Sequence, residues 1–341
     1  MYSGRREIGT GQGQRGLPAT RATTSGQLGL LLSRYFKVKV RDVSGTLIML
    51  LQAPIIAVLL AVVFGGMEKS VPAWCLGALQ GLQSQAGGAA QPAPKLQPTA
   101  DSTAAIFFLV LAAVWFGTSN AAREIVSERA IYLRERMVNL GLLNYVFSKY
   151  ILLALFCVLQ CTCLLAIVFP ALGLPGGGQA FGEMLAALVA MALCAVSIGL
   201  LLSTVVGSSE AAMALTPIAL IPQIVLGGLM VPMTSMPRTI RVIMQGIPAR
   251  WGFEAAIAPN RTALATDEGW LIDLGQRGVK AEFIENGKFK CALAQMASDT
   301  QVGAWGFTTY DQIWIPYTVL GGMTVFFIIV VSVLLKRRDP V

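Results

Sequence analysis

Six apolar stretches without a charged residue constrain this chain more than any other feature, because each is long enough to cross a lipid bilayer. A membrane-spanning helix needs about 20 predominantly apolar residues, since the hydrocarbon core is about 30 Å thick and each helical residue adds about 1.5 Å. Continuous apolar runs also lack the alternation of a transmembrane β-strand. We therefore predict an all-α polytopic membrane protein with six transmembrane helices. The stretches are Val43–Met67, Ser102–Ala122, Tyr150–Gly182, Met184–Ser209, Ala211–Pro237 and Gln312–Leu335.

The basic residues predict how these helices are oriented. They gather before the first stretch, between the second and third, and after the last. Flanks rich in Lys and Arg stay in the cytoplasm, so both termini and the connection between stretches two and three should be cytoplasmic. An even number of crossings fits this arrangement. The formal net charge of +8 lies largely in these flanks, so it points to the membrane rather than to nucleic acid.

The sequence divides into a linker, a surface helix and a membrane domain. Residues 1–26 are polar and rich in Gly and Thr, which is typical of a flexible linker. Residues 27–42 predict an amphipathic connecting helix on the cytoplasmic membrane surface, whose apolar face consists of Leu28, Leu31, Leu32 and Tyr35. A continuation of the first span into water is the alternative. Residues 43–341 form the transmembrane domain. Its external loop, 233–311, should begin with a helical part that dips back into the membrane as a re-entrant cap.

The fifth apolar stretch is the least regular of the six. Pro217, Pro222 and Pro232 each remove a backbone donor, and Gly227 and Gly228 lie between the last two prolines. A helix interrupted this often either lines a cavity or changes shape during function. Kinks tolerated for packing alone are the alternative.

The connection between stretches two and three, Arg123–Lys149, is the most informative segment outside the membrane. Residues 123–138 are good helix formers without Gly or Pro, so we expect a helix there. Exposed helices normally pair opposite charges three or four residues apart. Here Glu124 and Glu128 are like charges at that spacing, and the other charged residues find no complement. The charges should therefore pair with another loop, the amphipathic helix or a separate cytoplasmic protein; a solvated polar loop is the alternative.

Several kinds of chemistry are disfavoured by the residues present. The sequence contains no histidine, which removes Ser-His and Cys-His nucleophile pairs and imidazole metal ligands. The six stretches contain no aspartate to face Asp311, as an intramembrane aspartyl protease would need, and no midspan ionisable residue typical of ion-coupled transporters. The Cys residues of the third stretch are better explained as buried thiols than as metal ligands. We expect no catalytic residue and no metal site. Cys75 and Cys291 fall on the predicted external side, where a disulfide between them is permitted.

Three segments carry a family resemblance. They are the run Ser127-Glu128-Arg129 with Tyr132 and Arg134-Glu135, the segment Gly228-Leu229-Met230-Val231-Pro232, and the segment Pro248-Ala249-Arg250-Trp251-Gly252-Phe253-Glu254-Ala255. In this order relative to six spans, they resemble the coupling helix, the end of the fifth span and the external re-entrant helix of type-2 ABC exporters. The resemblance is strongest to the G-subfamily half-transporters of sterols, lipids and drugs.

The resemblance implies that two membrane domains, by default two copies of this chain, enclose a cavity between spans two and five. The residues assigned to coupling with the ATPase are Glu124, Ser127, Glu128, Arg129, Tyr132, Arg134 and Glu135. Those assigned to the substrate cavity are Phe116, Thr118, Ser119, Asn120, Thr216 and Gln223, and those assigned to the gate are Leu229 and Met230.

The energy source should lie outside this membrane domain. The sequence contains no G-x-x-x-x-G-K-[ST] phosphate loop, so we expect ATP and Mg to bind a partner nucleotide-binding subunit or a domain fused upstream. The predicted function is that of a permease, not an enzyme, for an ATP-driven exporter of a lipid, a glycolipid or a drug-like molecule. We expect a multi-pass protein of the cell membrane, the bacterial inner membrane. A non-transporting membrane scaffold subunit is the alternative.

Overall fold

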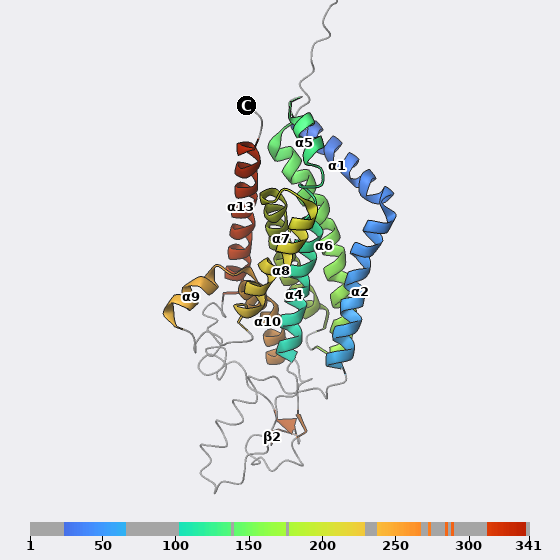
Figure 1. Ribbon diagram of the computed structural model, residues 1–341. Coiled ribbons are helices and arrows are strands. Elements are labelled where there is room, and N and C mark those ends of the chain that lie inside the picture. The colour runs from blue at the N-terminus through green and yellow to red at the C-terminus, as the bar shows by residue number, and fades with distance from the viewer. Residues whose placement is uncertain are drawn as a thin grey trace, which may run out of the picture.

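The computed structural model describes residues 24–65, 102–137, 140–174, 177–228, 237–266, 272–273, 284–285, 288–289 and 312–338. These residues form a bundle of long helices that run in alternating directions (Figure 1). Five described helices are long and apolar enough to cross a membrane, which confirms a multi-pass helical protein. They are α2 (Val43–Gly65), α4 (Ser102–Ala121), α6 (Leu142–Leu172), α7 (Gly177–Val205) and α13 (Trp314–Arg337).

The centre of the bundle is the pair α4 and α7, which pack against each other more extensively than any other described pair. Glycines allow their close approach. A Cβ at Gly117 would lie 2.5 Å from the carbonyl oxygen of Ala192, and one at Gly199 would lie 2.6 Å from that of Thr118. Small residues are favoured at such contacts because packing between membrane helices depends on close van der Waals contact. Helices α2 and α13 lie at the periphery and expose apolar side chains, as lipid-facing helices do.

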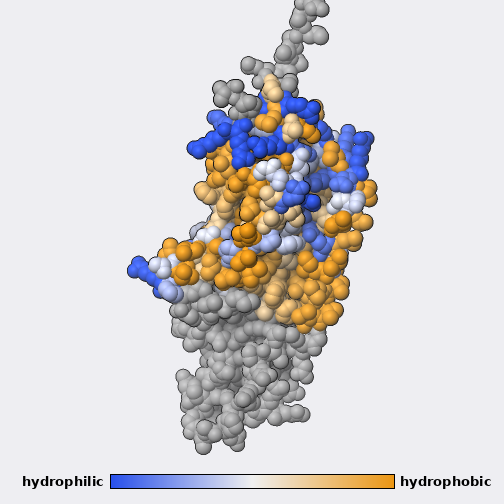
Figure 2. Space-filling view, in the orientation of Figure 1, coloured by the Kyte–Doolittle hydropathy of each residue, from blue (hydrophilic) through white to orange (hydrophobic). Residues whose placement is uncertain are grey.

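Polar and apolar surfaces divide along the length of the bundle. Figure 2 shows polar residues gathered at the end where Figure 1 places α1, α5 and the end of α13, with an apolar surface below them. At this end, Arg338 follows α13 and donates hydrogen bonds to the carbonyl oxygens of Thr204 and Val205 in the last turn of α7. Those carbonyls lack partners within their own helix, so Arg338 satisfies them.

The predicted bounds of the third and fourth spans were wrong. We expected the third span to begin at Tyr150, after Lys149, but α6 begins at Leu142 and carries Lys149 inside the helix. It ends at Leu172 and is followed by Gly173, whose φ of 59° is the left-handed conformation that commonly closes a helix. The fourth span was expected from Met184, but α7 begins at Gly177.

The fifth predicted span is described as α8 (Ser209–Val225), which has 17 residues. A helix of that length reaches about 26 Å, which is shorter than a hydrocarbon core of about 30 Å. Five of the six predicted spans are therefore found at spanning length, and this one is not. Prolines at 217 and 222 interrupt its hydrogen bonds, and Gly228 beyond it has a φ of 103°. Figure 1 places the start of α8 at the α5 end of the bundle and the start of α13 nearer the opposite end.

The predicted external loop contributes two described helices, α9 (Arg238–Gln245) and α10 (Pro248–Thr266). Helix α10 packs against α7, α13 and α4, so a helical part of this loop lies against the long helices. The loop also contains three strands of two residues each. The strands β1 (Ile272–Asp273), β2 (Ile284–Glu285) and β3 (Lys288–Phe289) form an antiparallel sheet in the order β1-β3-β2.

Two helices lie at the polar end of the bundle. Helix α1 (Thr24–Arg41) is the predicted connecting helix, and it begins three residues inside the segment that we expected to be linker; residues 1–23 lie outside the described part. Helix α5 (Arg129–Arg136) is the predicted helix between α4 and α6. It is shorter than the expected 123–138, because residues 122–128 form turns instead.

Candidate functional site

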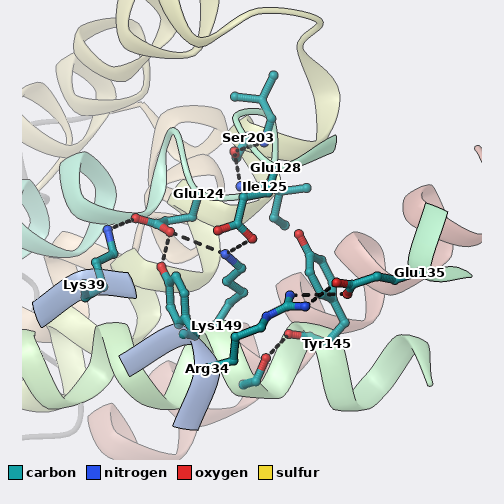
Figure 3. Close-up of polar contacts among 12 residues, drawn as sticks. Arg34, Lys39, Glu124, Ile125, Glu128, Glu135, Tyr145, Lys149 and Ser203 are labelled. Atoms are coloured by element: carbon teal, nitrogen blue, oxygen red, sulfur yellow. Dashed lines mark hydrogen bonds and ion pairs between the residues drawn. The ribbon is translucent and has the colours of Figure 1, made fainter. Parts of the chain in front are cut away.

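The charged residues meet where α1 crosses the ends of α4, α5 and α6 (Figure 3). Leu31 and Tyr35, two residues of the predicted apolar face of α1, are buried there, and α1 packs mainly on α6. Lys39, four residues after Tyr35 and on the same side of α1, reaches Glu124 in the turn after α4. Arg34 reaches Glu135 of α5. Of the three partners that we considered for the charged segment, the structure therefore shows the amphipathic helix.

Lys149 of α6 lies at the centre of this site. Its side chain is 2% exposed, and its Nζ forms an ion pair with Glu128 and a second with Glu124, at 3.7 Å from Oε2. The ring of Tyr35 covers the ammonium group, with its centroid 3.8 Å from Nζ. A buried charge is costly unless it is paired, and these contacts provide the pairing. We call Tyr35, Lys39, Glu124, Glu128 and Lys149 the Lys149 cluster.

Glu124 joins α1 to this cluster. Its carboxylate accepts hydrogen bonds from the Tyr35 hydroxyl and from Lys39 Nζ, both in α1. Burial raises the pKa of Tyr35 well above its ordinary value, and the negative charge of Glu124 raises this pKa further. The hydroxyl therefore stays protonated and remains a donor. One carboxylate thus holds two residues of α1 and faces Lys149 of α6.

Two further contacts fasten α1 along its length. Arg34 forms an ion pair with Glu135 of α5, with Nη2 3.3 Å from Oε2, and the hydrogen bond to Glu135 raises the pKa of Arg34. Gln27 accepts hydrogen bonds from the Asn144 amide at 2.8 Å and from the backbone N–H of Gly141 at 3.2 Å. These contacts bind helix α1 to α5 and to the start of α6.

The turn at residues 122–128 replaces the first part of the helix that we predicted. Ser203, in the last turn of α7, accepts hydrogen bonds from the backbone N–H groups of Ile125 at 2.9 Å and Val126 at 3.0 Å (Figure 3). At the same time, Glu124 and Glu128 are held by Lys149. These tertiary contacts override the local preference for a helix. They also connect the turn to α7.

The seven predicted coupling residues divide into two sets. Glu124 and Tyr132 are buried, and Glu128 and Glu135 are half-buried in ion pairs with α6 and α1. Ser127, Arg129 and Arg134 are exposed. The exposed apolar side chains Ile131 (40%) and Met137 (73%) lie beside them. We call Ser127, Ile131, Arg134 and Met137 the α5 outer face, since their spacing of four, three and three residues places them on one side.

The predicted cavity residues lie in several helix interfaces. Asn120 accepts a hydrogen bond from Gln52 of α2 at 3.0 Å and donates to Gln160 of α6 at 2.7 Å, whereas Gln223 accepts one from the backbone N–H of Ala249 in α10 at 2.8 Å. Two other members, Thr118 and Thr216, donate to carbonyl oxygens of their own helices. Phe116 is fully buried and Ser119 is half-buried.

The remaining predicted residues are only partly described. The gate residues Leu229 and Met230 lie outside the described residues, as do Cys75 and Cys291. Cys157, Cys161 and Cys194 are buried free thiols, as expected for small apolar side chains in a membrane domain.

Sequence reasoning missed several residues of this site. Neither Lys149, at the edge of the third predicted span, nor Ser203, within the fourth, was among the predicted site residues. The signal for Lys149 was present: Glu124 and Glu128 lie four residues apart and require a cation between them. The apolar residues of the α5 outer face, Ile131 and Met137, were visible as apolar residues within a charged helix.

Comparison with known proteins agrees with this architecture. The model of the ABC-2 type transporter family matches residues 26–259, which include α1, the Lys149 cluster, α5 and the start of α10. One relative is the ABC transporter ATP-binding/permease protein Rv1747 of Mycobacterium tuberculosis (strain ATCC 25618 / H37Rv), which is 31% identical over 166 residues. The match covers 45% of this chain and only 18% of that relative.

Proposed function

Because this chain belongs to the ABC-2 type transporter family, we propose that it is the permease of an ATP-driven exporter and that an ATPase docks on the α5 outer face. The observation that carries this proposal is the division of α5 into two sides. One side is bound to α1 and α6, and the other exposes Ile131, Arg134 and Met137. A helix that is fixed to the bundle and open to a partner suits force transfer between two proteins.

The contacts of the site indicate how such a force would travel. Movement of α5 pulls on the turn at 122–128, which continues directly from α4. Glu124 and Glu128 pass the movement to α6 through Lys149, and to α1 through Tyr35 and Lys39. Ser203 passes it to the end of α7. Four helices would therefore respond together, while ATP and Mg would be held by the partner ATPase.

The partner ATPase is either a separate subunit or a domain of the same protein. The name of the M. tuberculosis relative combines ATP-binding and permease functions, which supports a fused arrangement there. For this chain we propose six spans with both ends in the cytoplasm of a bacterial inner membrane, and a homodimer of membrane domains. The placement of α8 and α13 in Figure 1 supports the sixth crossing. By resemblance to the G subfamily, the substrate would be an amphipathic or hydrophobic molecule, such as a lipid, glycolipid or drug-like compound.

The docking proposal can be tested with a pair of matched substitutions. Met137→Asp places a charge on the α5 outer face, and Val242→Asp places one at an equally exposed apolar position of α9, where the side chain is 67% exposed. The chain is expressed together with candidate ABC ATPase subunits from the same source, and co-purification and ATP hydrolysis are measured. We expect Met137→Asp to abolish co-purification and Val242→Asp to leave it intact.

Two outcomes would count against the proposal. Equal co-purification of both variants would show that the ATPase docks elsewhere. An ATPase that co-purifies with the wild type, but whose hydrolysis never responds to the chain, would favour the scaffold alternative.

A further inference from the structure

Helix α10 reaches deep into the membrane part of the bundle. A Cβ at Gly252 would lie 2.7 Å from the sulfur of Met191, which is in the middle of α7. The ring of Phe253 packs edge-on against Phe107 of α4, with 5.0 Å between centroids. The first two turns of α10 therefore lie among the spanning helices rather than above them.

A side chain from α8 satisfies the start of α10. The first turn of a helix has backbone N–H groups without partners in that helix, and leaving them unsatisfied in an apolar environment is costly. Pro248 has no N–H, and Ala249 donates its N–H to Gln223 Oε1 at 2.8 Å. Ala249 is fully buried and Gln223 is 6% exposed. Gln223 therefore acts as an N-terminal cap supplied by another helix.

Because of its position on α8, Gln223 connects the end of this helix to α10. The buried side of α8 is a single stripe that consists of Ala212, Thr216, Leu220 and Gln223. Gln223 is the last of the four, at the end where the helix stops. Of the side-chain hydrogen bonds described for α8, that of Gln223 reaches another helix, whereas those of Ser208 and Thr216 stay within α8 and its cap.

The first turn of α10, which contains Ala249, is held in place by the next residue, Arg250. Arg250 is fully buried, with Nη2 3.4 Å from Glu254 Oε2, Nη1 2.9 Å from Gln245 Oε1, and its guanidinium stacked 4.1 Å from the ring centroid of Trp251. Charged residues at membrane depth persist only where they are paired. These contacts fix the first turns of α10 and its junction with α9. Helix α10 is thus a rigid support to which α8 is attached.

We propose that Gln223 is a positioning residue that latches the outer end of α8 to α10, so that the two move as one body. This inference goes beyond the cavity role predicted for Gln223, and it rests on the proposed function only for its part in transport. Without the amide, α8 would keep its apolar contacts but lose its directional link to α10.

The latch is tested by hydrogen–deuterium exchange of the purified chain in lipid nanodiscs. Gln223→Met keeps the length of the side chain but removes the acceptor, and Gln223→Glu keeps an acceptor oxygen at the same position. Gln179→Met, at an exposed residue that bonds to Glu183, is the control. We expect Gln223→Met to speed exchange in the peptide 247–252 about tenfold, the effect of losing one buried hydrogen bond. Gln223→Glu and Gln179→Met should leave exchange near that of the wild type. Unchanged exchange in Gln223→Met would overturn the latch. Gln223→Glu changes the same position but keeps the acceptor, so normal exchange in that variant shows that substitution at this position does not by itself unfold the protein.

A second arm uses the complex with its ATPase, trapped by Mg-ATP and vanadate. In the wild type, exchange in the peptides of α8 and of 247–252 should change together on trapping, and in Gln223→Met only one should change. Independent changes in the wild type would also overturn the latch. If no ATPase complex forms, the proposed function fails, but the first arm still decides whether Gln223 caps α10.

Discussion

Two joints of the bundle hold their helices together in different ways. At the polar end, the Lys149 cluster uses several charged groups, and both Lys149 and Glu124 have more than one partner. Deeper in the bundle, the side-chain link described between α8 and α10 is one neutral hydrogen bond, which Gln223 accepts from the backbone N–H of Ala249. The first joint keeps its connections when one contact is lost. The second joint holds α8 and α10 together only while that bond is intact.

The energies involved follow the same division. Breaking a buried ion pair by removing one partner costs about 3–5 kcal/mol, whereas a neutral hydrogen bond contributes about 1 kcal/mol net. The Lys149 cluster is therefore the stronger joint, and the bond between α8 and α10 is the weaker one.

Removing the central cation should cause the largest loss of stability. Lys149→Met leaves the buried Glu124 and the half-buried Glu128 without the cation that they share, and we expect a loss of about 4 kcal/mol. Thermal unfolding in detergent measures it. Lys37→Met, at an exposed position of α1, is the control and should be near neutral. A small effect of Lys149→Met would mean that Lys39 alone balances both carboxylates.

A smaller loss should follow when the ion pair of α10 is broken. Glu254→Gln removes the charge opposite Arg250 but keeps an oxygen that can accept a hydrogen bond, so we expect a loss of about 2 kcal/mol. The same unfolding assay applies. A loss greater than that of Lys149→Met would mean that the contacts of α10 contribute more to stability than the Lys149 cluster does.

The amide chain between α2, α4 and α6 should contribute less again. Asn120→Leu removes the link between Gln52 and Gln160, and hydrogen bonds between membrane helices are worth about 1 kcal/mol. Thr162→Leu, where the hydroxyl bonds within its own helix, provides the comparison. If both variants unfold alike, the amide chain adds nothing beyond packing.

The exposed ion pair of α1 should have the smallest effect. Arg34 is 44% exposed on its side chain, and we expect Arg34→Ala to cost about 0.5 kcal/mol, as exposed pairs usually do. Salt should weaken the pair, so the difference from wild type should shrink at high ionic strength. A cost that does not depend on salt would place Arg34 within the buried cluster instead.

The sequence predicted the helices better than the contacts that connect them. Apolar length is a strong signal, so five of the six stretches overlap helices of spanning length. The periodicity of α1 also identified its buried side through Leu31 and Tyr35. The errors arose where a tertiary contact reverses a local rule. Lys149 looks like the end of a span until Glu124 and Glu128 neutralise it, which allows α6 to begin eight residues before the predicted start. Ser203 likewise diverts the N–H groups of Ile125 and Val126, and no pattern near those residues reveals it.

The candidate site shows the same limit. Sequence reasoning identified α5 and its charges, but it could not separate the residues that bind the bundle from those left for a partner, because burial depends on where α1 lies. Gln223 was predicted to lie in the substrate cavity, as a polar residue of an apolar span. Its hydrogen bond with the N–H of Ala249 could not be predicted, because Ala249 lies 26 residues away along the chain.

The hydrogen bonds from Arg338 to the last turn of α7 matter when this protein is shortened for structural work. Deleting the residues from Lys336 onward, as is often done to shorten a membrane protein for crystallisation, would release the carbonyl groups of Thr204 and Val205 and loosen the end of α7, one of the two central helices. A shortened version should therefore keep Arg338.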